Sequence, residues 1–266
     1  MLIISTHQLS AQNTALDNLS KNLPCIEKNF NLRVLMTVDS ASRLPLRSQV
    51  EVNNILHKTS EYFEPICMSF SSCNYEIIEN YSYNNLFDSL RVKEMGVVYG
   101  YPKRINIFFV NNVINNDCGY SYLGGFSTRR EAQIYVELSC TDEPAEQIAR
   151  HMGRLLGLLN TNHEGHTQVA NADNCSTTGD RLCSTPADPY GYTRNANGDW
   201  VVSANPLLEE YYNACEFTWE VVDDNGDYYT PSMTNMMSPY PCKCHFTEEQ
   251  FSLMVDAYQA SPYKQY

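Results

Sequence analysis

Residues 150–160 read Arg150-His151-Met152-Gly153-Arg154-Leu155-Leu156-Gly157-Leu158-Leu159-Asn160. The stretch lies in a predicted helix over residues 143–159, which begins after Thr141 with polar capping residues, an acid in the first turn and an early proline. One face of this helix is apolar and holds Ile148, Met152, Leu155, Leu156 and Leu159. Arg150 and Arg154 are four residues apart, so we expect them together on the opposite side, facing a cleft or solvent.

Other segments accompany this helix in a definite order. Residues 235–238 read Asn-Met-Met-Ser and are followed by Cys242, Phe246-Thr247, Gln250 and Met254. Residues 179–188 read Gly-Asp-Arg-Leu-Cys-Ser-Thr-Pro-Ala-Asp, and residues 105–110, 119–120 and 133–136 precede the helix. Together with residues 150–160, these segments resemble the pappalysin-type metzincins (M43 peptidases) over roughly residues 30–260. Ser184 departs from that family's pattern, which has Asp at this place.

The resemblance implies a zinc helix in which every residue that does chemistry has been replaced. The family signature H-E-x-x-H-x-x-G-x-x-H supplies three His ligands, a Glu general base and a glycine at a turn. The ligand positions hold Arg150, Arg154 and Asn160, and the general-base position holds His151. Gly157 keeps the turn, so the frame of the motif is present without its catalytic residues.

The resemblance also assigns a Met-turn to residues 235–238, with Met237 as the methionine beneath the metal. Pro239 displaces to Tyr240 the tyrosine that often follows this turn, so its oxyanion-stabilising role is not carried over. We expect Arg150, Arg154 and Tyr240 to line the inherited cleft as a possible ligand site.

Zinc does not suit these positions. A zinc ligand must offer a lone pair, whereas guanidinium has none and stays charged because its pKa lies above about 12. Two unit charges about 4 Å apart interact by about 4 kcal/mol at an effective dielectric of about 20, and a dication would be repelled by about twice that. Without the Glu, no group takes the proton from a metal-bound water. We therefore expect no zinc cofactor and no catalytic residues.

The pattern of elements and the resemblance predict an α+β, metzincin-like (zincin) fold. We expect strands at residues 30–36, 68–70, 75–78, 105–110 and 133–138, and helices at 47–63, 143–159 and 247–258. Residues 1–29 form an N-terminal extension in this scheme. Residues 30–159 form an upper subdomain with a mixed twisted sheet and two main helices. Residues 160–266 form an irregular, disulfide-bonded lower subdomain that contains the Met-turn and ends in a helix.

Ten cysteines without a Cys-x-x-Cys pair favour a disulfide-bonded exported protein, which predicts a secreted, cell-surface or periplasmic location. No signal peptide is visible after Met1, where the apolar run is short and no basic segment precedes it. Cys242-Lys243-Cys244-His245 is spaced too tightly for a usual zinc knuckle. The resemblance instead pairs Cys242 with Cys215.

Composition restricts the partners. A net charge of −13 over 266 residues argues against nucleic acid and anionic membranes, both of which need a basic face. No run approaches the apolar residues, about 18, of a membrane span. A peptide, glycan or protein ligand remains.

Three functions compete. The preferred one is a catalytically inactive pseudopeptidase that acts as an exported binding module. The second is an active metalloendopeptidase with non-standard ligands, such as His151 with His163 or His166. The third is a structural module of a cell-surface assembly, its cleft filled by its own side chains.

Arg150 and Arg154 are equally open to interpretation. They form the solvated face of a helix, neutralise a buried acid such as Asp180 or Asp188, or bind an anion or carboxylate in the cleft.

Overall fold

A five-stranded mixed sheet organises the chain. The computed structural model describes residues 23–38, 44–114, 118–128, 131–140, 142–195, 197–202, 212–213 and 215–262. The strand order is β2-β1-β4-β7-β6, from β1 (Lys28–Thr37), β2 (Met68–Ile78), β4 (Asn106–Val110), β6 (Gly119–Ser121) and β7 (Gln133–Glu137). Neighbouring strands run parallel, except that β6 pairs antiparallel with β7 at one edge.

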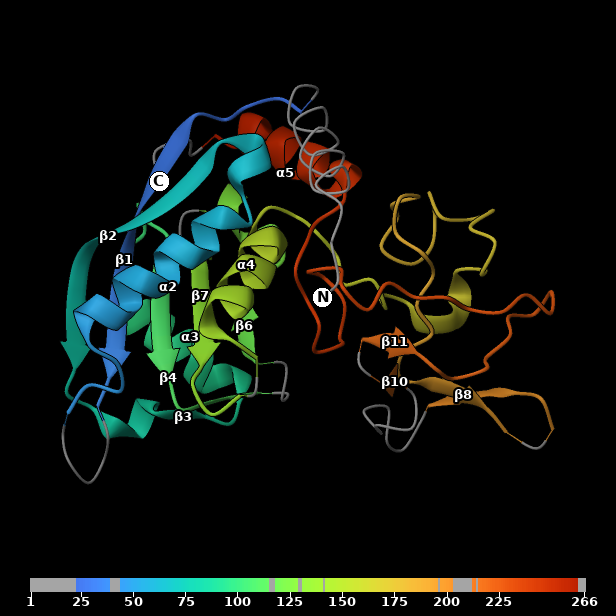
Figure 1. Cartoon of the computed structure of the whole chain (residues 1–266). Helices are drawn as coiled ribbons and strands as arrows, with labels where there is room; N and C mark the ends of the chain where they lie inside the picture. Colours follow the sequence, from blue (N-terminus) through green and yellow to red (C-terminus); the bar gives the residue numbers. More distant parts are fainter. Residues whose placement is uncertain are drawn as a thin grey trace, which may run out of the picture.

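Helices cover both faces of this sheet. Every residue of β4 and of β7 is buried, as in strands that are covered on two sides. On one face the sheet packs with α2 (Gln49–Glu61) and α4 (Pro144–Leu155), which Figure 1 shows in front. On the other face it packs with α3 (Ser89–Tyr99). The expected mixed sheet is confirmed, whereas the expectation of two main helices is wrong, because α3 is a third.

The sequence pattern did not predict α3. This helix buries Val92, Met95 and Gly96 and leaves Leu90, Val97 and Val98 largely exposed. Exposed apolar residues blur the periodicity by which an amphipathic helix is recognised. Its start is nevertheless capped, because the Asp88 side chain accepts a hydrogen bond from the Arg91 N–H.

The predicted strands and helices are otherwise close to those observed. β2 is one strand that spans both predicted segments, and its register against β1 shifts at Cys73, an extra residue that forms a bulge. Ser48 and Glu51 form a capping box at the start of α2, although Val50, expected in the packed face, is 70% exposed. The last helix, α5 (Glu248–Ala260), has a similar box from Thr247 and Gln250.

α4 is shorter and more buried than the sequence predicted. It ends at Leu155 rather than Leu159, and Gly157, with φ of +95°, makes the turn that follows. Its N-cap Glu143 makes no side-chain capping bond. Nine of its twelve residues are buried, including Arg150, so a solvated face is wrong for that residue.

The chain after α4 is mostly irregular, and Figure 1 shows its yellow and orange part beside the sheet. It holds β8 (Tyr192–Arg194), β9 (Trp200–Val202), β10 (Tyr212–Asn213) and β11 (Glu216–Phe217), paired as two short hairpins. Elsewhere lie β3 (Asn85–Leu86), β5 (Asn112–Val113) and the 3-10 turns Glu64–Ile66, Tyr81–Tyr83, Gly125–Ser127 and Gly165–Thr167. α5 returns to the sheet, where Tyr258 packs edge-on against Phe30 of β1 with ring centroids 5.8 Å apart.

Four disulfides lie among the described residues: Cys25–Cys67, Cys118–Cys140, Cys175–Cys183 and Cys215–Cys242. The Cys215–Cys242 pairing is confirmed. Four such bonds are consistent with an extracellular or periplasmic protein. None of the helices in the described part of the chain has the length and apolar character that crossing a bilayer requires.

Met237 lies fully buried beneath α4. A methyl group in place of the Gly153 hydrogen would be 3.0 Å from Met237 Sδ and 3.3 Å from Phe246 Cε1. The Met237 N–H donates to Asn235 Oδ1 at 2.8 Å, and Asn235 is in turn paired with Gln250 of α5. The turn is thus fixed from both sides, by α4 above and by α5 through its amide bonds.

We expect Met237→Ala to lower the free energy of unfolding by about 2–5 kcal/mol, because it leaves a cavity under α4. Met237→Leu, which nearly conserves volume, should cost less than about 1.5 kcal/mol. Urea denaturation of both variants tests this. Equal midpoints for Met237→Ala and the parent would show that the contact does not stabilise the fold.

Candidate functional site

The four positions that the resemblance equates with the zinc motif lie in the second half of α4 and in the turn that follows. Arg150 is 4% exposed and His151 1% exposed, whereas Arg154 and Asn160 are half-buried. Arg154 Nη1 donates to Asn160 Oδ1 at 3.2 Å. The turn at Gly157 therefore brings together Arg154 and Asn160, two of the three positions that the resemblance equates with ligands, and a hydrogen bond joins their side chains.

His151 points towards the edge strand of the sheet. Its Nδ1 lies 3.0 Å from Ser121 Oγ in β6, and a methyl group on Gly119 would be 2.6 Å from Nε2. Burial, and secondarily the positive charges of Arg150 and Arg154, hold the pKa of His151 well below its usual range. The imidazole is therefore neutral at pH 7 and has no room beside it for a bulky ligand on the strand side.

The other histidines proposed as ligands lie elsewhere. The His166 ring stacks on Trp200 with centroids 4.5 Å apart, and His163 Nε2 lies 3.9 Å from Glu164 Oε1. Within the described residues, the only cluster of three possible metal ligands from His, Cys, Asp and Glu contains none of these histidines.

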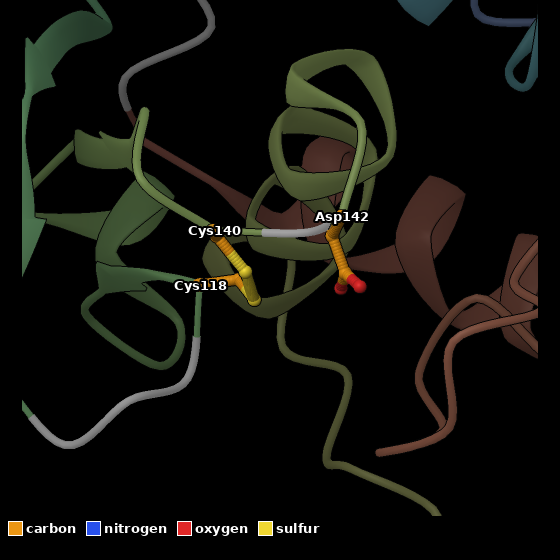
Figure 2. A group of neighbouring side chains, drawn as sticks. All are labelled: Cys118, Cys140 and Asp142. Carbon is orange, nitrogen blue, oxygen red and sulfur yellow. A yellow bond between two sulfur atoms is a disulfide. The ribbon is translucent and has the colours of Figure 1, made fainter.

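That cluster is Cys118, Cys140 and Asp142, and Figure 2 shows it at the start of α4. Cys118 and Cys140 are joined in a disulfide, so neither offers a thiolate. Asp142 Oδ2 accepts a hydrogen bond from Lys243 Nζ at 2.6 Å. The cluster is a structural junction and not a metal site.

The Lys243–Asp142 ion pair ties the segment after Met237 to the start of α4. The side chains are 2% and 10% exposed, respectively. Burial lowers the pKa of Lys243, and the nearby Arg150 charge lowers it further, while Asp142 raises it. Arg150 and Lys243 thus place two positive charges in the buried region beside α4.

Tyr240 is part of a buried network and not a cleft surface, which corrects the sequence-based expectation. It is 1% exposed, and its hydroxyl donates to Asp188 Oδ1 at 2.9 Å. Thr161 Oγ1 donates to Asp188 Oδ2 at 2.8 Å, and the Tyr190 N–H donates to Oδ1 at 3.0 Å. The Thr161 N–H also donates to the Met237 carbonyl at 3.2 Å, which connects this network to the buried turn.

The two buried acids suggested as partners for the arginines take their hydrogen bonds from their own surroundings. Asp180 accepts from the Thr185 hydroxyl and the Leu182 N–H. Burial raises the pKa of Asp180 and of Asp188 to about 6, although these hydrogen bonds lower it in part.

Sequence reasoning missed Ser121 and Lys243. Ser121 is a single hydroxyl in a three-residue strand, 30 residues from its histidine partner, and no local pattern marks it. Lys243 stands between two cysteines, which drew attention to disulfide and metal chemistry and away from the lysine. Its partner Asp142 lies 101 residues away.

The residues at the motif positions do not fit zinc. Guanidinium groups offer no lone pair, and the His151 nitrogen that faces Ser121 is already engaged. Two atoms with lone pairs are left: His151 Nε2, which has no hydrogen-bond partner, and the Asn160 amide oxygen, which accepts from Arg154. They fall short of the four ligands, or three and a water, that a zinc site takes. No step of a metal-dependent reaction can be derived from this set.

The mixed sheet with one antiparallel edge, the helix α4 and the closing helix α5 define the class of fold. It is a metallopeptidase-like fold, metzincin-like in its coarse features. The sequence itself matches no family model and no curated protein.

Two solved structures carry this assignment. Mirolysin in complex with compound 9 aligns with 91% of this chain and 96% of its own, at a TM-score of 0.53 and 13% identity. A promirolysin mutant from Tannerella forsythia aligns with 98% of this chain and 92% of its own, at a TM-score of 0.51 and 12% identity. At such identities the similarity is one of fold alone.

A third structure, of a chaperone–substrate complex, aligns with 88% of this chain but only 35% of its own, at a TM-score of 0.37 and 12% identity. That similarity is too weak to indicate a shared fold.

We expect Asp188 to make stability depend on pH. Its pKa in the folded protein is about 6, above the ordinary value of 3.8. The protonated carboxyl group therefore stabilises the fold fully below about pH 4, and this stabilisation is lost as the pH rises through about 6. The free energy of unfolding of Asp188→Asn, relative to that of the parent, should therefore rise by up to about 3 kcal/mol between pH 4 and pH 7. Urea denaturation across this range measures the difference.

His151, whose pKa is lowered, makes stability rise with pH instead, but it is present in both proteins and its effect cancels in the comparison. Asp173→Asn, at an exposed site, serves as the control. Identical pH profiles for Asp188→Asn, Asp173→Asn and the parent would contradict the assignment of a raised pKa to Asp188.

Proposed function

We propose that this protein is a pseudopeptidase: an exported protein with a metallopeptidase-like fold that binds a peptide or protein segment beside α4 without cleaving it. The observation that carries the proposal is the Arg154–Asn160 hydrogen bond, because it occupies two positions where the resemblance puts zinc ligands. The neutral, buried His151 stands where the resemblance puts the general base, and its Nδ1 faces Ser121. The four disulfides support export.

Arg154 is the residue best suited to contact a ligand. It is only half-buried, and the Arg154 guanidinium presents several donors in a planar fork that matches a carboxylate. Arg150 and Tyr240 are too deeply buried to meet a ligand directly. A peptide carboxylate beside Arg154 is the chemistry that we infer.

A structural role is the second candidate. Arg150, Tyr240 and Lys243 are each at most 4% exposed and belong to the interior of the protein. A module of a cell-surface assembly needs no more than this. The active peptidase with non-standard ligands has less support, because His151 is not gathered with His163 or His166 in the described structure.

We expect the purified protein to bind no stoichiometric zinc and to cleave no peptide, because the donor set lacks ligands and base together. Elemental analysis after incubation with excess zinc, followed by a casein cleavage assay, measures both. The matched control is the variant Arg150→His, His151→Glu, Arg154→His and Asn160→His, which restores the family's donors on the same backbone. One zinc per parent chain that disappears in His151→Gln would contradict the proposal and support the active alternative.

The variant Arg154→Gln distinguishes a role of Arg154 in ligand binding from a role in stabilising the fold. We expect it to weaken binding of peptides selected from a phage-displayed random library at least tenfold, while stability changes by less than about 1 kcal/mol, as is usual for substitutions outside the core. Arg150→Gln, at a buried position, should lower stability instead. If Arg154→Gln lowered stability and left peptide binding unchanged, or if no library peptide bound the parent, the structural role would be favoured.

A further inference from the structure

A cavity of about 400 Å³ lies on the α3 side of the sheet. Its lining includes Lys93, Gly96, Val97 and Gly100, which follow one another at the spacing of a single helix face. α4 packs on the opposite face of the sheet, so the cavity is separate from the motif positions and does not depend on the function proposed above.

Two glycines make room for the Gln133 side chain at the wall of the cavity. A methyl group on Gly96 would lie 2.1 Å from Gln133 Oε1, and one on Gly100 would lie 2.9 Å from Gln133 Nε2. The Gln133 amide therefore occupies space that any other residue at these positions would fill. No larger residue fits there without moving the side chain at the floor of the cavity.

The Gln133 amide is fixed in orientation. Its side chain is almost fully buried, Nε2 donates to the Gly96 carbonyl at 3.2 Å, and Oε1 accepts from the Tyr135 hydroxyl at 2.8 Å. Tyr135 is held in turn, because its hydroxyl lies 2.8 Å from the Val92 carbonyl. A polar group held by such a network loses little freedom when a ligand binds.

The rim combines aromatic rings with balanced charge. Tyr101 is 48% exposed, Tyr122 is half-buried, and both line the cavity. Lys93 and Glu131 bring one positive and one negative charge to the same lining. Thr128 Oγ1 donates to Glu131 Oε2 at 3.1 Å, which steadies the carboxylate. Within the part of the lining that the structure describes, these two opposite charges balance, so it favours neither a net anion nor a net cation.

We propose that this cavity binds a neutral saccharide unit. A sugar ring has an apolar C–H face, which packs on aromatic rings such as those of Tyr101 and Tyr122, and hydroxyl edges that both donate and accept. Glu131 accepts from hydroxyls, Lys93 donates to them, and Gln133 provides the fixed polar floor. Ligand sites for small molecules measure about 300–1,000 Å³, and the cavity of about 400 Å³ lies within this range.

Filling the cavity from α3 tests this. Val97 lines it and is 64% exposed, whereas Val98 is 59% exposed on the same helix and is not among the lining residues. The parent, Val97→Trp and Val98→Trp are titrated with methyl α-mannoside, methyl β-galactoside and N-acetylglucosamine, followed by saturation-transfer NMR. We expect at least one sugar to bind with a Kd of about 1 mM, Val97→Trp to weaken it at least tenfold, and Val98→Trp to leave it unchanged.

A second variant tests the site in case Val97→Trp does not fold. Glu131→Gln removes a charge at an exposed site without adding volume, and it should weaken the same sugar at least threefold with an unchanged thermal transition. Absence of saturable binding by all three sugars, or equal weakening by Val97→Trp and Val98→Trp, would overturn the proposal. So would binding of the zwitterion glycylglycine in place of the sugars, because it would assign the Lys93 and Glu131 charges to an amino-acid ligand.

Discussion

The contact between Met237 and Gly153 is the constraint on which the arrangement depends. Gly153 lets Met237 Sδ approach α4 where a side chain would intervene, and the hydrogen bonds of Asn235 hold the turn in that position. The segment after the turn leads to Lys243, whose ion pair with Asp142 fixes the start of the same helix. One stretch of chain thus holds α4 in its middle and at its beginning.

This dependence explains why the sequence was informative about fold. Gly153, Gly157 and Met237 are packing and turn residues, and they are part of the resemblance from which the fold was predicted. The buried strands were equally readable, because β4 and β7 contain unbroken apolar runs, at residues 107–110 and 134–136, of the kind that parallel sheets require. The disulfide of Cys215 and Cys242 followed from the same resemblance and not from spacing.

The site was less predictable, for physical reasons that differ between residues. Arg150 and Lys243 are charged residues that the sequence alone assigns to a surface, and their burial depends on neighbours distant in the chain. Tyr240 was assigned to a cleft by its position after the turn, but Asp188, 52 residues earlier, draws its hydroxyl inwards. α3 escaped recognition because its apolar residues are largely exposed and its buried face includes a glycine.

The bulge at Cys73 has a consequence for self-association. β2 is an eleven-residue strand at the edge of the sheet, and a long regular edge offers unpaired amide and carbonyl groups to any other extended chain. At Cys73 the extra residue breaks the regular spacing of these groups, and beyond it Glu76 carries a charge that is bound to Arg33 of β1. The opposite edge is only three residues long. In the described part of the chain, neither edge of the sheet therefore offers a second molecule a long regular template, which disfavours strand addition.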